Sequence, residues 1–444
     1  MSFSMTQSWA STMLPTSSNI LIVGAGTWGC SIALELARRG HTSIIVLDGS
    51  SFPSPISAGN DLNKIAEESN DPSESDSLQD FFWNRLAQLA MHAWKCDPLF
   101  SPFYHDTGFI MAAVGDEAYQ RCLEYAKGEK EFPAGLNTKH DFQQTMPGGL
   151  LQGDFPGWRG FWKKKGAGWV FASGALRAMH QEAVRLGVEF LTDSIEGGVE
   201  ELLYNSDNSA VSGVRTRNGS EHKAQHIIVS AGANSDLLLD FESQLRPTAW
   251  TLAHLPLSAE EAKQYRNLPV LYGVDRGFFI EPDTETHEIK LCDEHPGYIN
   301  PVINDSGKMR SVPFARQQIP REAEARMRLL LSDTMPQFAT RDLSFARLCW
   351  DVDTVDRIFL IDKHPNVQGL IVAVGGSGNG FMACPAIGSL VADIVENNSE
   401  GKMREAMRWR PEICAERDLW DAQGRYGAEG KVMDIRQVTE WTTM

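Results

Sequence analysis

Three glycines at fixed spacing near the start of the chain could hold the phosphates of a dinucleotide. Gly24, Gly26 and Gly29 form the pattern GxGxxG directly after the apolar run 19–23. The first glycine permits a tight turn, and the second lets the backbone approach a pyrophosphate. The third lets a following helix pack closely on the strand. A glycine-rich turn in an α/β fold that binds no nucleotide is the structural alternative.

The segments around these glycines decide between the two readings. Thr27 and Trp28 open a stretch with apolar residues at helical spacing, and the N–H groups at the start of such a helix favour an anion. The next apolar run, 42–48, ends in Asp48, 24 positions after Gly24. A carboxylate there can accept hydrogen bonds from ribose hydroxyls. Strand, helix, strand and terminal acid together predict a dinucleotide site.

Two later glycine-ended segments favour FAD over a nicotinamide cofactor. Residues 226–233 (HIIVSAGA) resemble the second glycine-ended strand of FAD-dependent oxidoreductases, and residues 375–381 (GGSGNGF) resemble the flavin-facing glycine loop of the same group. A nicotinamide dehydrogenase has no need of three such elements. The resemblance assigns Gly376, Gly380 and Phe381 to the cofactor, and Gly378 to the substrate.

Composition excludes several other classes of function. The chain has 444 residues, 42% of them hydrophobic, and a net charge of −17, so phosphate backbones and anionic lipid are disfavoured as partners. Seven cysteines without CxxC pairs argue against a disulfide framework and a zinc ribbon. His222 and His226 have HxxxH spacing, but the histidines form no HExxH pattern, and no metal site is predicted. The first 18 residues lack the basic and apolar regions of a secretory signal, and the chain ends without a peroxisomal tripeptide. An intracellular, cytoplasmic protein is expected, and no heptad pattern demands assembly beyond a monomer.

The order of the segments predicts an α/β fold with an added β-rich domain. We expect a Rossmann-type FAD-binding domain of the glutathione-reductase type, built from 1–95, 165–240 and 345–400. An inserted antiparallel-sheet substrate domain would comprise 96–164 and 241–344, because short strand-like runs dominate 245–320. The last segment, 401–444, is expected to contribute to the substrate site.

From residue 19 to residue 441 the sequence resembles a known family of flavoenzymes. It is similar to the sarcosine-oxidase-like branch of the glutathione-reductase-type flavoproteins, and more closely to the fungal fructosyl amino acid oxidases, or amadoriases. The specific matches are 57–65 (SAGNDLNKI), 348–354 (LCWDVDT) and 424–427 (GRYG). The family implies oxidation of a C–N bond in an N-substituted amino acid, with O₂ as electron acceptor. It also implies cofactor contacts from Ser57, Lys64, Val199, Asp351 and Met382.

Cys349, Lys290 and Glu294 take specific roles from this resemblance. The family's cysteine at position 349 forms a thioether with the flavin, so FAD is expected to be covalent through Cys349; a buried structural cysteine is the alternative. Lys290 matches a lysine that promotes the reaction with O₂, and its charge can stabilise the anion that develops there. Glu294 matches a glutamate that contacts the substrate. Lys290 and Glu294 are the predicted catalytic residues, and a solvated lysine on a strand is the alternative for Lys290.

Three positions depart from the sarcosine oxidases and change the expected substrate. Asn63, Ala66 and Met382 stand where those enzymes carry basic residues. A small amino acid would lose its usual carboxylate clamp there, so sarcosine itself is not expected to be the substrate. Arg425 is predicted to anchor the carboxylate, since a planar guanidinium binds a carboxylate through two hydrogen bonds. Lys64 is a second candidate.

The leading hypothesis is therefore an FAD-dependent oxidase of fructosyl amino acids. It would act on a glycated amino acid and O₂ to give the free amino acid, glucosone and H₂O₂. An oxidase of sarcosine, another N-methyl amino acid or pipecolate is the alternative enzyme. A flavin-binding protein without oxidase turnover is the third hypothesis, and the rate at which O₂ reoxidises the reduced flavin separates it from both oxidases.

Overall fold

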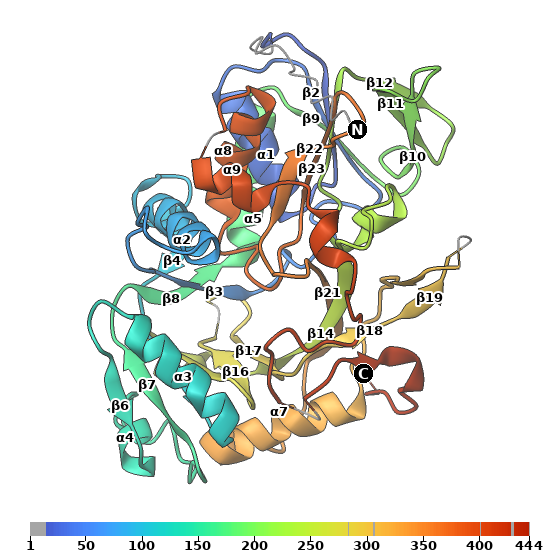
Figure 1. The fold of residues 1–444 in the computed structure, drawn as a ribbon. Helices are drawn as coiled ribbons and strands as arrows, with labels where there is room; N and C mark the ends of the chain where they lie inside the picture. The colour runs from blue at the N-terminus through green and yellow to red at the C-terminus, as the bar shows by residue number, and fades with distance from the viewer. Residues whose placement is uncertain (1–14, 283, 305–306, 400, 428–429, 444) are drawn as a thin grey trace.

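The structure is a computed structural model that describes residues 15–443 except 283, 305–306, 400 and 428–429. The chain forms two large sheets, one in the upper and one in the lower half of Figure 1. Two long strands of the lower sheet, β14 (Arg246–Pro256) and β21 (Phe345–Asp353), extend towards the upper sheet. Residues 1–14 and 444 lie outside the described residues, and the expectations about a secretory signal and a peroxisomal tripeptide fall largely on these residues.

The upper sheet has the order expected of a dinucleotide-binding fold. Its described strands run in the order β22-β23-β13-β1-β2-β9, parallel except for β22. Three separate segments of the chain supply them, so the fold closes only when distant segments pair. The strands are β1 (Ile20–Val23), β2 (Ile44–Asp48), β9 (Glu189–Thr192), β13 (His226–Val229), β22 (Leu360–Lys363) and β23 (Leu370–Val374).

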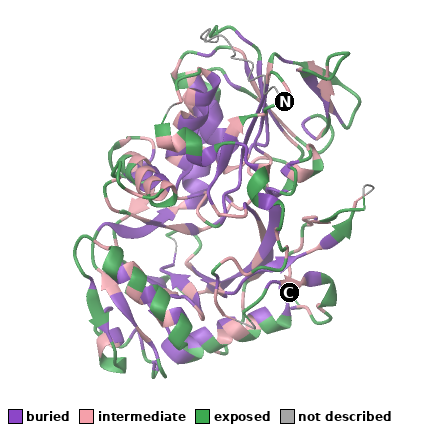
Figure 2. Ribbon diagram, viewed as in Figure 1, coloured by how far each residue is buried: buried purple, intermediate pink, exposed green. Residues whose placement is uncertain are grey.

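Both faces of this sheet are covered, which explains why its strands are apolar throughout. Ile20 and Ile22 of β1 face a core shared with the helices, whereas Leu21 and Val23 face a core shared with a three-stranded meander. Figure 2 shows the buried residues gathered on the helices beside the sheet. The covering elements are α1 (Thr27–Arg38), α2 (Leu78–Cys96), α5 (Ala172–Arg185), α8 (Cys384–Val395), α9 (Gly401–Met407), β10 (Val199–Tyr204), β11 (Val211–Thr216) and β12 (Glu221–Lys223).

The lower sheet is mainly antiparallel. Its order is β24-β18-β14-β17-β16-β15-β5-β7-β6, with β21 also paired to β14. The pairs β15–β5 and β18–β24 are parallel. The remaining strands are β5 (Phe109–Ala113), β6 (Ala134–Leu136), β7 (Arg159–Lys163), β15 (Val270–Gly273), β16 (Gly277–Ile280), β17 (Glu288–Cys292), β18 (Tyr298–Ile299) and β24 (Met433–Asp434).

Strand β17 shows how this sheet separates a core from a cavity. Ile289 and Leu291 point into a core that includes Leu330 and Leu331 of α7, which lies below the sheet in Figure 1. The alternating position Lys290 therefore points to the opposite face. The helices of this half are α3 (Asp116–Gly128), α4 (Lys139–Gln143), α6 (Ala259–Gln264) and α7 (Arg321–Thr334).

The remaining elements are small. A three-stranded sheet has the order β3-β8-β4, and β19 and β20 form a hairpin. These strands are β3 (Asn63–Glu67), β4 (Tyr104–His105), β8 (Ala167–Phe171), β19 (Pro301–Ile303) and β20 (Met309–Ser311). Short 3₁₀ helices are η1 (Ser101–Phe103), η2 (Gly232–Leu237), η3 (Pro336–Phe338), η4 (Pro411–Cys414) and η5 (Ile435–Gln437).

The predicted fold class, an α/β domain with a β-rich domain, agrees with this architecture. The predicted domain boundaries stay a prediction. The strand β21 falls in the segment 345–400, which was assigned to the FAD-binding domain, yet it pairs with β14 of the lower sheet. Among the described helices none is long and apolar enough to cross a membrane.

Candidate active site

A cavity of about 1410 Å³ connects the two sheets. Pockets for small ligands occupy roughly 300–1,000 Å³, so this cavity has room for a dinucleotide and a second small molecule. All of the site residues predicted from the sequence line it except Gly29. They are Gly24, Gly26, Thr27, Trp28, Asp48, Ser57, Lys64, Val199, Lys290, Glu294, Cys349, Asp351, Gly376, Gly378, Gly380, Phe381, Met382 and Arg425. Their individual contacts with a cofactor or a substrate stay predictions.

The glycines of the first turn are required by close backbone contacts. Gly24 has φ +110°, and a Cβ there would overlap the carbonyl oxygen of Ser230, at the end of β13. A Cβ at Gly29 would overlap the carbonyl oxygen of Gly24, so this glycine packs α1 against the turn instead of lining the cavity. Gly26 caps α1 without a side-chain hydrogen bond. The first N–H groups of α1 are therefore left for an anion.

Asp48 lies at the carboxyl end of β2, beside the same turn. Its Oδ2 accepts a hydrogen bond from the Ala25 N–H at 2.8 Å, and its Oδ1 accepts one from the Ser50 N–H at 2.9 Å. Burial raises the pKa of this carboxyl, and the two N–H groups oppose that shift. The aspartate thus fixes the turn as well as facing the cavity, where its free lone pairs can meet ribose hydroxyls.

The second glycine loop packs tightly between α1 and β21. The Trp28 indole N–H donates to the Gly380 carbonyl at 2.8 Å, and the Gly378 N–H donates to Asp351 Oδ2 at 2.6 Å. A Cβ at Gly376 would lie 3.0 Å from Asp351 Oδ1. The loop can therefore approach a flat ligand with its backbone alone.

These features fit a bound FAD. The cavity runs along the carboxyl ends of β1, β2, β13 and β23, where open α/β sheets bind nucleotides. The Ser230 Oγ faces this region, is buried and has no hydrogen-bond partner among the described residues, so a ligand atom would satisfy it. The first turn of α1 and Asp48 would hold the pyrophosphate and ribose, and the 375–381 loop would approach the ring system.

At the other end of the cavity one carboxylate holds two lysines. Asp61 Oδ2 accepts hydrogen bonds from Lys290 Nζ and from Lys64 Nζ, each at 2.6 Å. Lys290 also donates to the Asn63 carbonyl at 2.9 Å, and its side chain is 2% exposed. Although burial by itself raises it, the charges of the two lysines hold the pKa of Asp61 well below its usual range. This group carries an excess positive charge that would stabilise a developing anion.

Two free thiols lie near these lysines. Cys349 stands within β21, opposite Trp250 of β14, and lines the cavity. Cys292 ends β17 and lines the same cavity. Burial raises the pKa of Cys292 to about 12, against the opposing charge of Lys290. Only Cys349 belongs to the motif 348–354, so the structure adds a second thiol that sequence reasoning did not single out.

Glu294 lies two residues beyond β17 and is partly buried in the cavity wall. Burial raises the pKa of its carboxyl to about 7, although the charges of Arg425 and Arg357 and a hydrogen bond with Tyr272 oppose the shift. A Cβ at Gly427 would overlap the Glu294 carbonyl oxygen. The C-terminal segment therefore packs directly on this residue.

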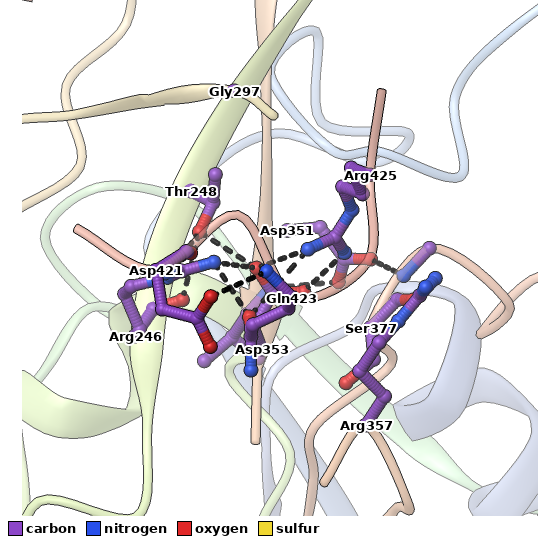
Figure 3. Close-up of polar contacts among 12 residues, drawn as sticks. Arg246, Thr248, Gly297, Asp351, Asp353, Arg357, Ser377, Asp421, Gln423 and Arg425 are labelled. Carbon is purple, nitrogen blue, oxygen red and sulfur yellow. Dashed lines mark hydrogen bonds and ion pairs between the residues drawn. The ribbon is translucent and has the colours of Figure 1, made fainter. Parts of the chain in front are cut away.

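Arg425 is buried and engaged with Asp353 (Figure 3). Its Nη2 donates to Asp353 Oδ1 at 2.7 Å, and its Nη1 donates to Asp353 Oδ2 at 3.2 Å. Its guanidinium lies 4.6 Å from the centre of the Trp250 ring. Arg246 and Thr248 donate to the same Asp353 oxygen, Oδ2, at 3.1 and 2.8 Å. The fork that was predicted to bind a substrate carboxylate is thus occupied by a carboxylate of the protein.

The structure also brings in residues that sequence reasoning missed. Asp61 and Asp353 lie inside the quoted motifs, but their motifs did not reveal that each is shared by two cations. Arg357 and Arg121 also line the cavity, Arg121 from the exposed face of α3. Nothing in their local sequence sets these arginines apart from ordinary surface residues. Only the pairing of distant segments places them.

Two of the three positions without basic residues, Asn63 and Ala66, lie on β3 together with Lys64. Asn63 is fully buried, and its amide atoms have no hydrogen-bond partner among the described residues. Ala66 is buried in the core beside the helices. Met382 lines the cavity, and its carbonyl accepts a hydrogen bond from the Trp94 indole at 2.7 Å. Lys64 and Lys290 both line the cavity in this region, and Lys290 donates to the Asn63 carbonyl.

Comparison with known proteins identifies the family. Residues 19–394 match the family model described as FAD dependent oxidoreductase. The chain belongs to this family. Among solved structures, fructosyl amine:oxygen oxidoreductase (Amadoriase I) from Aspergillus fumigatus is 50% identical over 98% of this chain and 99% of its own, with a TM-score of 0.94. The deglycating fructosamine oxidase Amadoriase II from the same organism is 46% identical over 97% and 98%, with a TM-score of 0.90.

A curated relative at lower identity is L-saccharopine oxidase from Schizosaccharomyces pombe, 28% identical over 91% of this chain and 96% of its own. As a member of the FAD dependent oxidoreductase family, the protein is an FAD-dependent enzyme. The identity of the bound cofactor as FAD follows from the family. The covalent bond through Cys349 does not follow from it.

Proposed function

We propose that this protein is an FAD-dependent oxidase of fructosyl amino acids. The observation that carries the proposal is that Lys290 and Glu294 face the same cavity as the dinucleotide end, in a chain half identical to Amadoriase I over nearly its full length. Bound FAD supplies a two-electron acceptor that O₂ reoxidises. The substrate loses a hydride and a proton across its C–N bond and becomes an imine, and O₂ is reduced to H₂O₂. Water then splits the imine into the free amino acid and glucosone.

Three residues of the chain have separate roles in this reaction. Lys290, held by Asp61, would place its charge where O₂ accepts electrons. Glu294 would accept hydrogen bonds from the substrate, which its position in the cavity wall permits. We also propose that Cys349 forms a thioether with the flavin, supported by its place in the cavity wall beside Lys64.

The carboxylate anchor needs revision within this proposal. Arg425 was predicted to bind the carboxylate through its fork, but both of its Nη atoms already donate to Asp353. We propose that Arg425 contributes its positive charge to the site and packs its guanidinium against an aromatic ring of the protein. The substrate carboxylate is bound by another cation of the cavity. The candidates are Lys64, which lines the cavity as Met382 does, and Arg121, an exposed residue that also lines it.

The oxidation of sarcosine is the alternative, and the lack of basic residues at Asn63, Ala66 and Met382 disfavours it. Peroxide release from fructosyl-lysine, fructosyl-valine and sarcosine, measured side by side, tests the proposal. Rapid peroxide release with the fructosyl substrates alone is expected, and turnover of sarcosine alone would contradict it. We further propose that the protein is a monomer and that it is intracellular and cytoplasmic; the seven free cysteines support that compartment through its redox state.

A further inference from the structure

Arg357 is presented to the cavity by a turn that other residues hold rigid. The turn links β21 to β22. Thr354 Oγ1 donates to Asp356 Oδ1 at 3.2 Å and to the Ile358 carbonyl at 2.7 Å. Arg410 donates to both oxygens of Asp356, at 3.0 and 2.9 Å. The residues on either side of Arg357 are therefore fixed by hydrogen bonds that do not involve its side chain.

The backbone and side chain of Arg357 are both in unfavourable states. Its φ is +64°, in the left-handed region that costs free energy for residues other than glycine. Its Nη2 donates to the Ser377 carbonyl at 3.1 Å, but its Nε is buried and has no hydrogen-bond partner among the described residues. A buried donor left without a partner costs about 1–3 kcal/mol. Such strain and unmet hydrogen bonding at a cavity wall indicate a ligand contact.

The neighbours of Arg357 define what that ligand can be. Arg357 lines the cavity with Glu294, Tyr272 and Arg425. Burial and the charge of Arg425 lower the pKa of its guanidinium to about 10, against the opposing charge of Asp353. Arg425 has Asp353 as its counter-ion, whereas the guanidinium of Arg357 donates to a neutral carbonyl. Figure 3 shows Arg357 beside Ser377 and Arg425 beside Asp353.

A hydroxyl group suits this position better than a carboxylate does. A substrate carboxylate would meet the carboxyl groups of Glu294 and Asp351 in the same wall, and like charges repel at short range. A hydroxyl both donates and accepts, so it can accept from Arg357 and donate to Glu294. Adjacent hydroxyls on one chain can satisfy both residues at once. Tyr272 adds a further polar partner.

We propose that Arg357 is a specificity-determining residue, which donates hydrogen bonds to hydroxyl oxygens of a polyhydroxylated N-substituent while Glu294 accepts from the same group. The inference rests on the proposed function, and it assigns Arg357 a part in selecting the sugar of a fructosyl amino acid. The sugar lies between Arg357 and Glu294, and the carboxylate lies away from them. Arg357 thereby distinguishes a sugar from a methyl group on the amine.

The test measures binding to the holoenzyme with two unreactive ligands. The first is the thioether analogue of fructosylglycine, with sulfur in place of the amine nitrogen, and the second is the same compound with methyl in place of the carboxylate. Dissociation constants come from the change in flavin absorption. Arg357→Met removes the donors at similar side-chain length, and it should weaken both ligands by a similar factor, roughly 10- to 100-fold. Arg357→Lys, which keeps a donor, should recover part of the loss.

Arg417→Met is the matched control, because Arg417 is a similarly buried arginine that donates to the carbonyls of Ser243 and Asp353 and does not line the cavity. It should leave both constants within about twofold. A loss confined to the carboxylate-bearing ligand would overturn the inference, as would no loss or an equal loss in Arg417→Met. Peroxide release from fructosylglycine by the unaltered enzyme tests the proposed function separately. If that succeeds while Arg357→Met binds normally, the inference alone fails.

Discussion

The ammonium of Lys290 lies 2.6 Å from a carboxylate oxygen of Asp61, a residue 229 positions earlier in the chain. The same oxygen accepts a hydrogen bond from Lys64. Lys290 is therefore held at the cavity wall by this ion pair, although its side chain is only 2% exposed. Removing either member of a buried pair leaves the other charge without compensation. Here Lys64 remains to neutralise Asp61 if Lys290 is lost.

Replacement of Lys290 by Met should separate the two half-reactions of the enzyme. Lys290→Met removes the charge at similar length, so the reduced flavin should react with O₂ roughly 100-fold more slowly or worse. Anaerobic reduction by a fructosyl amino acid should slow much less, because Glu294 and Arg357 remain in the wall. Stopped-flow absorbance of each half-reaction provides the measurement. Equal slowing of both would mean that the lysine supports the structure of the site generally.

Attachment of the flavin should depend on Cys349 alone. After acid precipitation of the holoenzyme, the yellow colour should remain with the protein pellet. Acid precipitation of Cys349→Ser should release the flavin into the supernatant. Before precipitation, the folded Cys349→Ser variant should still bind the flavin noncovalently through the glycine turn and Asp48. Cys292→Ser is the matched control, because Cys292 lines the same cavity and is also free. Release by the Cys292 variant, or from the unaltered enzyme, would contradict the assignment.

Much of the cofactor end could be predicted from the sequence because its determinants are local. The glycines at 24, 26 and 29 and the acid at 48 lie within one strand–helix–strand unit, so their spacing encodes their geometry. The loop 375–381 was recognisable for the same reason. The structure adds physical causes, such as the overlap that a Cβ at Gly24 would make with Ser230.

The substrate end could be predicted only in part because its partners are distant in the chain. Arg246 and Arg425 meet at Asp353 across 107 and 72 positions, and no local pattern encodes such a meeting. Arg425 could be named from its motif, but the occupation of its fork by Asp353 could not. Arg357 gave no signal at all, because positive φ and an unpartnered Nε are properties of the folded chain.

Ligand binding should depend on pH through Glu294. Burial raises the pKa of this carboxyl to about 7, so it gains its charge between pH 6 and 8. A carboxylate accepts hydrogen bonds from sugar hydroxyls better than a neutral carboxyl does. The thioether analogue of fructosylglycine, which has no amine to titrate, should therefore bind more tightly as pH rises through 7. Glu294→Gln should weaken binding at pH 8 and remove this dependence.

The same group should affect stability with the opposite sign. Because its pKa is raised in the folded protein, the folded state holds the proton over pH values where the unfolded state has lost it. The free energy of unfolding contributed by Glu294 therefore falls as pH rises from about 4.5 towards 7. Glu294→Gln should flatten that part of the stability profile, measured by denaturant unfolding. An unchanged profile, with an unchanged binding curve, would assign both effects to another group.

The last prediction concerns Arg425, whose sequence motif favoured a carboxylate anchor. In the structure its two Nη atoms donate to Asp353, which also accepts a hydrogen bond from Arg246 (Figure 3). Arg425→Lys keeps the charge but loses one of two hydrogen bonds, so KM for a fructosyl amino acid should rise. Arg425→Ala should destabilise the folded protein more, by about 2–5 kcal/mol, because it removes one of the two arginines that pair with the buried Asp353 carboxylate. Thermal unfolding of the holoenzyme should show this loss together with the kinetics.

A carboxylate-free substrate, a fructosyl amine, decides what Arg425 binds. If its fork is committed to Asp353, the loss in kcat/KM should be similar for the fructosyl amine and the fructosyl amino acid. The preference of the unaltered enzyme for the fructosyl amino acid over the fructosyl amine should then depend on another cation. Lys64→Met or Arg121→Met should abolish this preference and leave kcat/KM for the fructosyl amine unchanged. If instead the fructosyl amine is indifferent to Arg425→Lys while the amino acid is not, the guanidinium must leave Asp353 to bind the substrate carboxylate. Asp353 would in that case be a competitor for the fork, and Asp353→Asn should tighten binding of the amino acid.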